Sequence, residues 1–200
     1  MTVEIQVIEE FLLEKAEFIL ASLGRYEEQR QLLPSSKQYI DGETFAVLGH
    51  EMRLRVVKGK IGVSSDGSYI TLSVRDPADR DQKEKILTKW LHGIYENTVR
   101  SLCENVYPKF RKYGVEFPTI RFRNMVSRWG SCQPKRKLLT FNYALLGAPV
   151  SCIEYVVIHE FTHFLYPNHS KQFYLQLSMF MPDWRERKAM LENQYGLISE

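Results

Sequence analysis

The sequence is poor in cysteine and contains no long apolar run. Its 200 residues include three cysteines, Cys103, Cys132 and Cys152, whose spacing matches no zinc knuckle and no CxxC pair. An odd and low cysteine count indicates reduced thiols. The amino-terminal residues are acidic where a signal peptide is basic, and no stretch approaches the roughly 18 apolar residues of a membrane span. We therefore expect a cytoplasmic protein that makes no contact with a membrane.

Repeats, low-complexity segments and a strong net charge are also missing. The net charge of +3 is too small to indicate a partner, whereas 44% hydrophobic and 12% aromatic residues are typical of a folded chain. Positive charge gathers between Lys109 and Lys137, where Glu116 is the only acidic residue. The length suits one sizeable core or two small domains.

The spacing of apolar residues predicts an α+β fold. Residues 8–23 have helical spacing and are followed by a polar connector, so residues 1–38 are expected to form an amino-terminal helix and connector, and 39–200 a catalytic domain. Residues 39–75 alternate around turns at Asp41-Gly42 and Asp66-Gly67, which predicts a small antiparallel sheet. Segregated runs of strands and helices favour α+β over an alternating parallel sheet.

A long helix and a second hairpin are expected in the middle of the chain. Asp76 and Pro77 are typical of a helix start, and about 30 residues with an apolar stripe follow, with a kink or break near Pro108. A strand over 119–129 then leads into a hairpin that turns near Pro134. Helical patterns return from Ser151 to the end, with breaks at Pro167 and Pro182.

The stretch "HEFTHFLYPNH", from His159 to His169, carries the most specific chemical signal. Ser151 and Glu154 fit a capping box, which places His159 near the middle of a helix. Residues four apart on a helix share one face, so His159 and His163 can bind one tetrahedral ion. Glu160 beside them is placed to act as a general base.

A third ligand is expected because a catalytic zinc usually has three protein ligands and one open position. His169 is the candidate, since Pro167 and Asn168 allow the chain to turn back. The phenol of Tyr166 lies close by in sequence and is a candidate for binding a substrate oxyanion. A closed structural zinc site is disfavoured because no cysteine has suitable spacing. We expect one Zn²⁺ per chain, although nickel, cobalt or copper also suit three imidazoles.

The basic segment "IRFRNMVSRWGSCQPKRK" allows several interpretations. As one strand it would place Arg121, Arg123, Ser127 and Trp129 on one face and Arg128 on the other. A strand beside the active helix can pair with an extended peptide. Arg121, Arg123 and Arg128 also suit a triphosphate, with Trp129 stacking on the base. Alternatively, the charges form a solvated face, and Trp129 packs beside a glycine bulge.

Several motifs in the same order together resemble the YgjP-like metallopeptidase-domain family, which is related to the SprT-like and WLM zincins. They are "YIDGETFAVLGHEMRLRV", "SRWGSC", "LTFNYALLGAP", "IEYVVIHEFTHFLYPNHSKQF" and "MPDW". The resemblance implies a zincin-like fold in which a small antiparallel sheet packs on an active-site helix with a long supporting helix. It also implies zinc held by His159, His163 and His169, with Glu160 as the base. The family is usually labelled a peptidase, but one bacterial member is associated with splitting pyrophosphate from UTP.

Three functions are therefore compared. The first is a zinc-dependent metallopeptidase that acts on polypeptides through a Glu160-activated water. The second is a metal-dependent nucleoside triphosphate pyrophosphatase that clamps a nucleotide with the basic segment. The third is a non-enzymatic nucleic-acid-binding module, which the histidine–glutamate motif makes the least favoured of the three.

Overall fold

The computed structural model describes Ala16 and residues 37–195, and residues 38–195 belong to one compact unit. The helix expected over residues 8–23 lies outside the described residues apart from Ala16, which is helical. Most of the connector expected up to Gln38 lies outside them as well. None of the helices in the described part combines the length and apolar character that a membrane crossing needs.

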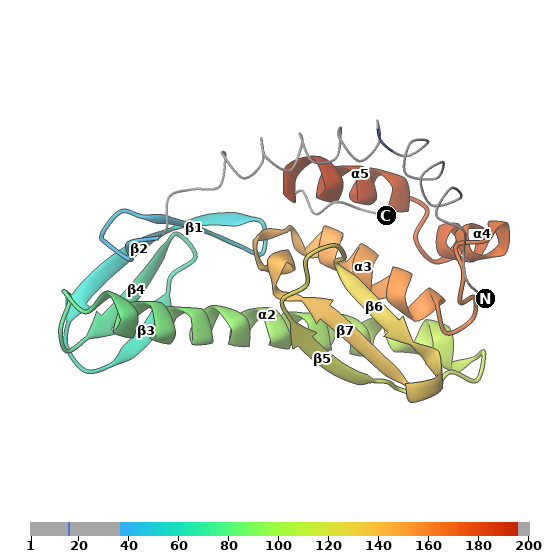
Figure 1. Cartoon of the computed structure of the whole chain (residues 1–200), viewed down its shortest axis with the longest axis horizontal. Helices are drawn as coiled ribbons and strands as arrows, with labels where there is room; N and C mark the ends of the chain where they lie inside the picture. Colours follow the sequence, from blue (N-terminus) through green and yellow to red (C-terminus); the bar gives the residue numbers. More distant parts are fainter. Residues whose placement is uncertain (1–15, 17–36, 196–200) are drawn as a thin grey trace. The chain divides into compact units, whose positions relative to one another are not determined.

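The first sheet has four strands in the order β1-β2-β4-β3, formed by Thr44–Val47, His50–Lys58, Tyr69–Val74 and Gly62–Ser65 (Figure 1). The prediction of an all-antiparallel sheet is wrong, because β2 and β4 run parallel. The Asp66-Gly67 turn joins β3 to β4 as expected. The Asp41-Gly42 turn instead precedes β1, and the first hairpin turns at Leu48-Gly49, where both residues have positive φ.

The Leu48-Gly49 turn contacts the segment that precedes the helix expected from Ser151 onward. The backbone amides of Leu48 and Gly49 donate to the carbonyl oxygens of Leu146 and Gly147 at 2.7 and 3.1 Å. A Cβ atom on Gly49 would lie 2.8 Å from the Cα of Pro149. The close approach and the φ of +87° both require glycine at this position.

Gly49→Ala should therefore destabilise the protein by about 2 kcal/mol or more, since it adds a backbone clash to the strain of a positive φ. Thermal unfolding followed by circular dichroism measures the loss. Gly42→Ala is the matched control, because Gly42 has a φ of +82° and no atom within 4 Å of the added Cβ. Equal destabilisation by the two substitutions would contradict the proposed contact with Pro149.

The long helix α2, Arg80–Arg111, packs on both sheets (Figure 1). Its length agrees with the predicted 30 residues, and Pro108 lies inside it without ending it. The expected start at Asp76 is wrong: Asp79 caps the helix by accepting from the Gln82 amide at 2.9 Å, whereas Asp76 accepts from the Ala78 amide in the preceding turn. Its buried residues Leu87 and Leu91 pack in the hydrophobic core of the first sheet. Its later buried residues, from Tyr95 to Phe110, belong to a separate core that includes residues of the second sheet and of the carboxyl-terminal helices.

The second sheet has three strands in the order β5-β7-β6, formed by Thr119–Arg123, Leu138–Asn142 and Gly130–Gln133. Strand β7 is parallel to β5 and antiparallel to β6, and the predicted hairpin turns through the short 3-10 helix η1, Pro134–Arg136. The strand expected over 119–129 is too long, because it ends at Arg123. Its proposed alternation of faces at Ser127, Arg128 and Trp129 is therefore wrong.

The loop between β5 and β6 takes its shape from Asn142, a buried residue at the end of β7. The Asn142 amide group donates to the carbonyl oxygens of Met125 and Arg128 at 2.8 and 2.9 Å. Its side-chain oxygen accepts from the amides of Met125 and Ala144. These bonds satisfy backbone groups that a longer β5 would have placed in a sheet ladder.

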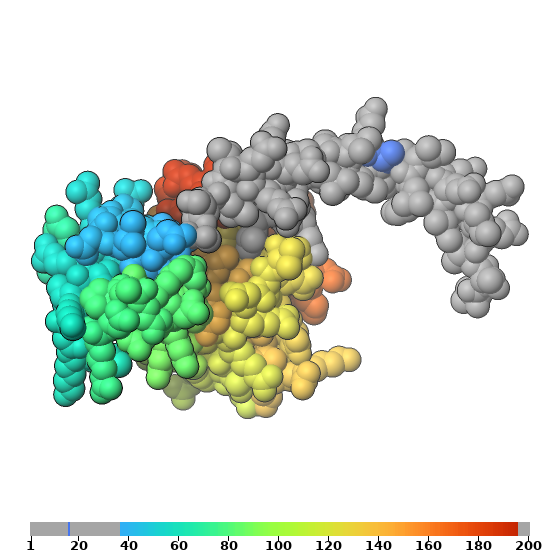
Figure 2. Space-filling model, turned by 60° about the vertical axis from the view of Figure 1, so that its left-hand side comes forward, coloured from blue at the N-terminus to red at the C-terminus, as the bar shows by residue number. Residues whose placement is uncertain are grey.

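The rest of the chain is helical: the 3-10 helix η2, Tyr143–Gly147, and the α-helices α3, Val150–Thr162, α4, Lys171–Phe180, and α5, Trp184–Tyr195. Seen from another side, the first sheet and the start of α2 lie at one end of this unit, and the second sheet lies beside them (Figure 2). The α+β class expected from the sequence is confirmed. The sheets are mixed, however, rather than antiparallel.

Candidate metal centre

Helix α3 carries the histidine–glutamate motif and is buried on almost every side. The predicted capping box is wrong, because the helix begins at Val150 with Pro149 at the cap. Glu154 instead pairs with Arg187 of α5 at 2.6 Å, and Arg187 also donates to the Ser151 carbonyl and to Asp183. This tertiary contact takes the carboxylate that the capping box would have used, and it fixes α5 against α3.

The three histidines converge at the carboxyl end of α3. His159 lies in its last turn, His163 is its C-cap, and His169 comes from the turn before α4. Their candidate ligand atoms all lie within 4.8 Å of one another, and the Nε2 atoms of His159 and His169 are 3.0 Å apart. Nδ1 of His163 faces the carbonyl oxygen of Tyr166 at 3.2 Å, which leaves Nε2 for a ligand bond.

Phe173 supports all three imidazoles, a role that no sequence pattern indicated. Its buried ring lies 5.0, 4.7 and 4.9 Å, centroid to centroid, from those of His159, His163 and His169. Phe173 stands in the first turn of α4, where its backbone amide donates to the capping hydroxyl of Ser170. The start of α4 therefore holds the loop that carries His169 against the end of α3.

The chemistry of this donor set fits zinc. Burial, together with the charges of the neighbouring His163 and His169, lowers the pKa of His159 to about 3. Burial also lowers the pKa of His163. These two imidazoles are thus neutral near pH 7, which is the form that binds metal ions. Three neutral nitrogen ligands in a concave site are typical of a catalytic zinc centre with one open coordination position.

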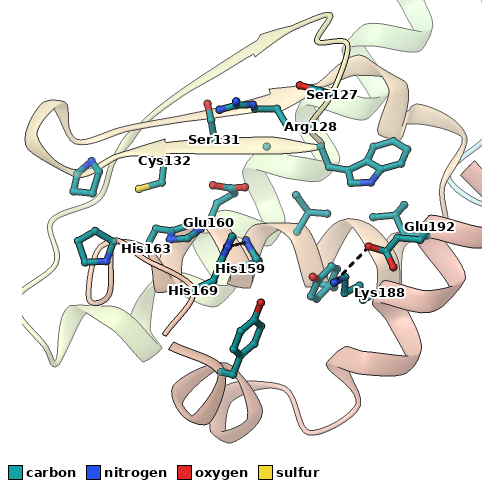
Figure 3. A pocket seen from close by; sticks show the side chains of 18 residues that line it. Ser127, Arg128, Ser131, Cys132, His159, Glu160, His163, His169, Lys188 and Glu192 are labelled. Carbon is teal, nitrogen blue, oxygen red and sulfur yellow. Dashed lines mark hydrogen bonds and ion pairs between the residues drawn. The ribbon is translucent and has the colours of Figure 1, made fainter. Parts of the chain in front are cut away.

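Glu160 points from α3 toward strand β6, on the same side of the helix as the histidines (Figure 3). A Cβ atom on Gly130 of β6 would lie 2.6 Å from Oε1 of Glu160, so the glycine provides the space that the carboxylate occupies. Burial raises the pKa of Glu160 to about 8, and the positive charge of Arg128 opposes this shift. A divalent cation beside the carboxylate would lower that pKa as well.

A cavity of about 280 Å³ opens over the histidines and Glu160. Among the candidate substrate residues, Arg128 and Trp129 line it. Arg121 and Arg123 do not line it. Phe122 pairs with Phe141, which in turn pairs with Gly130, so Phe122 lies on the face of the sheet toward Glu160. Its two arginine neighbours therefore project from the opposite face. Tyr166 does not line it either, and contributes its carbonyl oxygen to His163.

Sequence reasoning missed much of the wall of this cavity. Cys132 of β6, Tyr155 of α3 and Tyr174 of α4 line it, as do three residues of α5, namely Lys188, Leu191 and Glu192. The spacing within α5 places these three on one helical face, but nothing local indicates that the face meets the histidines. The position of α5 follows from long-range pairs such as Arg187 with Glu154.

His169→Ala should weaken zinc binding by roughly a hundredfold or more, because it removes one of three ligands. Competition against a chromophoric chelator measures the affinity. His50→Ala is the control, since His50 lies at the exposed start of β2. Unchanged zinc affinity in His169→Ala would show that His169 is not a ligand.

Comparison with known families places the chain among metallopeptidase domains, a class of metal-dependent hydrolases. The family model described as "YgjP-like, metallopeptidase domain" matches residues 1–194. The chain belongs to this family, which confirms the resemblance stated from its motifs and makes it a metallopeptidase-domain protein.

Two solved structures are similar to part of the chain. One is a metallopeptidase zymogen, abylysin of Pyrococcus abyssi, with 21% identity and a TM-score of 0.42 over 48% of this chain and 93% of that one. The other is the metallopeptidase zymogen jannalysin of Methanocaldococcus jannaschii, with 18% identity and a TM-score of 0.40. That match covers 46% of this chain and 92% of jannalysin. No curated protein matches the chain.

Proposed function

We propose that this protein is a zinc-dependent metallopeptidase of the HExxH class, in which Glu160 is the general base. The observation that carries the proposal is the juxtaposition of Glu160 with His159, His163 and His169 in one cavity. His159, His163 and His169 would hold the ion. When bound, zinc supplies Lewis acidity and lowers the pKa of a water molecule toward about 7.

Glu160 accepts the proton of the attacking water and delivers it to the leaving amine. Its burial suits both steps, because a raised pKa lets the carboxyl group hold a proton near neutral pH until the amide bond breaks. Gly130 keeps the carboxylate close to β6, where the scissile bond of a substrate would lie. Arg128 opposes the rise in pKa, and a divalent cation at the histidines would lower the pKa further and so favour the ionised carboxylate.

A polypeptide is the substrate that the surroundings of the cavity favour. Strand β6 stands at the edge of the three-stranded sheet within the described residues, and Ser131 and Cys132 line the cavity. An extended peptide can add to such an edge through backbone hydrogen bonds. A triphosphate would meet fewer cations than the sequence suggested, because Arg128 and Lys188 line the cavity whereas Arg121 and Arg123 lie on the opposite face of the sheet.

The test offers both substrate classes to the zinc-loaded protein. Mass spectrometry detects new termini in a mixture of unfolded polypeptides, and a pyrophosphate assay follows each of four nucleoside triphosphates. We expect peptide products and no pyrophosphate, with the products absent for Glu160→Gln. Pyrophosphate release without peptide products would replace this proposal by the nucleotide alternative. If neither product forms, hydrolysis of both substrate classes is rejected.

A further inference from the structure

Tyr174 places a phenol group in the wall of the cavity that also holds Glu160 and the three histidines. The residue stands in the first turn of α4, where its backbone amide donates to the Ser170 carbonyl at 3.2 Å. Its side chain is partly exposed, and its hydroxyl makes no hydrogen bond with any residue that the structure describes. A donor that a molecule in the cavity can reach is therefore left for a ligand.

Aromatic contacts fix this ring without using its hydroxyl. The ring stacks on the imidazole of His169, with centroids 6.0 Å apart and an angle of 29° between the planes. It also stacks on the Trp184 ring at 5.3 Å and 20°, and Phe173 meets it edge-on at 5.4 Å. The indole N–H of Trp184 donates in turn to the Ser178 hydroxyl at 2.9 Å. The phenol is therefore preorganised, so it can stabilise a developing charge without rearranging.

The phenol and Glu160 lie around the same part of the cavity, although they come from different helices. Both are close enough to Tyr155 to act on its hydroxyl: burial raises the pKa of Tyr155, and the charges of Glu192, Tyr174 and Glu160 raise it as well. A substrate carbonyl that is attacked by a Glu160-activated water therefore shares this space with the Tyr174 hydroxyl.

Other donors near the histidines are less suited to a developing negative charge. Lys188 Nζ already forms an ion pair with Glu192 at 3.5 Å (Figure 3). Tyr155 is only 6% exposed, and its ring meets that of His159 edge-on at 5.8 Å. Tyr166, the phenol that the sequence suggested for an oxyanion, does not line the cavity. Tyr174 is thus the phenol that combines a fixed ring with an accessible hydroxyl.

We propose that Tyr174 is a further catalytic residue, which donates a hydrogen bond to the substrate carbonyl oxygen as that oxygen becomes negatively charged. The inference rests on the proposed peptidase function. The water oxygen bonds to the carbonyl carbon, a water proton passes to Glu160, and the π electron pair moves onto the carbonyl oxygen. That pair then restores the carbonyl while the carbon–nitrogen bond breaks, and the nitrogen takes the proton from Glu160. Tyr174 keeps its own proton throughout and stabilises the oxyanion.

Binding of two probes to the zinc-loaded protein tests this role without turnover. N-phosphoryl-leucinamide presents tetrahedral anionic oxygens like those of the intermediate, whereas mercaptoacetyl-leucinamide offers a sulfur ligand and no tetrahedral oxygen. Isothermal titration calorimetry measures both affinities for the wild type and for Tyr174→Phe, which keeps the stacked ring and loses the hydroxyl. We expect the affinity for the phosphoryl probe to fall about tenfold or more, and that for the thiol probe to stay within about twofold.

Tyr107→Phe is the matched control, because Tyr107 is a partly buried tyrosine of α2 outside the cavity, and it should bind both probes as the wild type does. In a peptide assay, Tyr174→Phe should lower kcat about a hundredfold and leave KM within about twofold.

Four results would overturn the role of Tyr174. They are an equal loss of affinity for the two probes, no loss for either, no binding of the phosphoryl probe by the wild type, and a loss in Tyr155→Phe with none in Tyr174→Phe. If the wild type cleaves no polypeptide, the peptidase proposal fails, while the probe affinities still decide whether the Tyr174 hydroxyl binds an oxyanion.

Discussion

Glu160→Gln should abolish turnover while the protein keeps its metal. The amide is nearly isosteric with the carboxylate, so it fits the space against Gly130, but it cannot accept the proton of the attacking water. General-base removal costs about 10² to 10⁴ in rate. We therefore expect kcat to fall at least about a hundredfold, with zinc affinity within about twofold of wild type, measured by a product assay and by chelator competition.

Glu104→Gln provides the control for this substitution, because Glu104 lies on the exposed side of α2, away from the cavity. Its turnover should equal that of the wild type. Turnover retained by Glu160→Gln at the wild-type level would remove Glu160 from the mechanism. A loss of zinc in the same variant would instead indicate that the carboxylate helps to hold the ion.

The metal centre was the part most readable from the sequence, because its geometry is largely local. His159 and His163 lie four residues apart on one helix, and His169 follows His163 by only six positions. Helical periodicity and a proline turn are enough to bring such residues together. Even here one prediction was wrong: His159 was expected near the middle of the helix. Helix α3 ends at Thr162, so His159 lies in its last turn and His163 caps it.

Elements fixed by distant contacts were predicted less well. The capping box at Ser151 failed because Glu154 pairs with Arg187, a residue 33 positions away. Strand β5 ended early because Asn142, 17 positions from Met125, binds the loop that follows it. Nothing in a short window of sequence distinguishes these alternatives from the local ones, so capping patterns and strand alternation led to the wrong boundaries.

The topology of the first sheet shows the same limit. Alternating apolar residues correctly indicated the strands, and Asp66-Gly67 correctly indicated one turn. The parallel pairing of β2 with β4, however, depends on β3 turning back along the outer edge of β4. The positive φ of Leu48, a residue that rarely adopts this conformation, hid the other turn from sequence reasoning.

Gly130→Ala should inactivate the protein without unfolding it. An added Cβ would lie 2.6, 2.7 and 2.9 Å from Oε1, Cγ and Cδ of Glu160. All three atoms belong to a side chain that can rotate, so the clash is relieved by moving the carboxylate rather than the backbone. A displacement of about 1 Å in a catalytic group can cost about 10²-fold in rate. We expect at least about that loss in kcat, with a melting temperature close to that of the wild type.

Gly93→Ala controls for the added methyl group. Gly93 lies in α2, and a Cβ atom there would meet nothing within 4 Å, so this position should tolerate alanine.

The decisive comparison is the double variant of Gly130→Ala with Glu160→Gln. If alanine acts only by displacing the general base, the double variant should be no slower than Glu160→Gln alone, because the two substitutions remove the same contribution. Additive losses would show instead that Gly130 has a second role, such as room for the substrate backbone along β6.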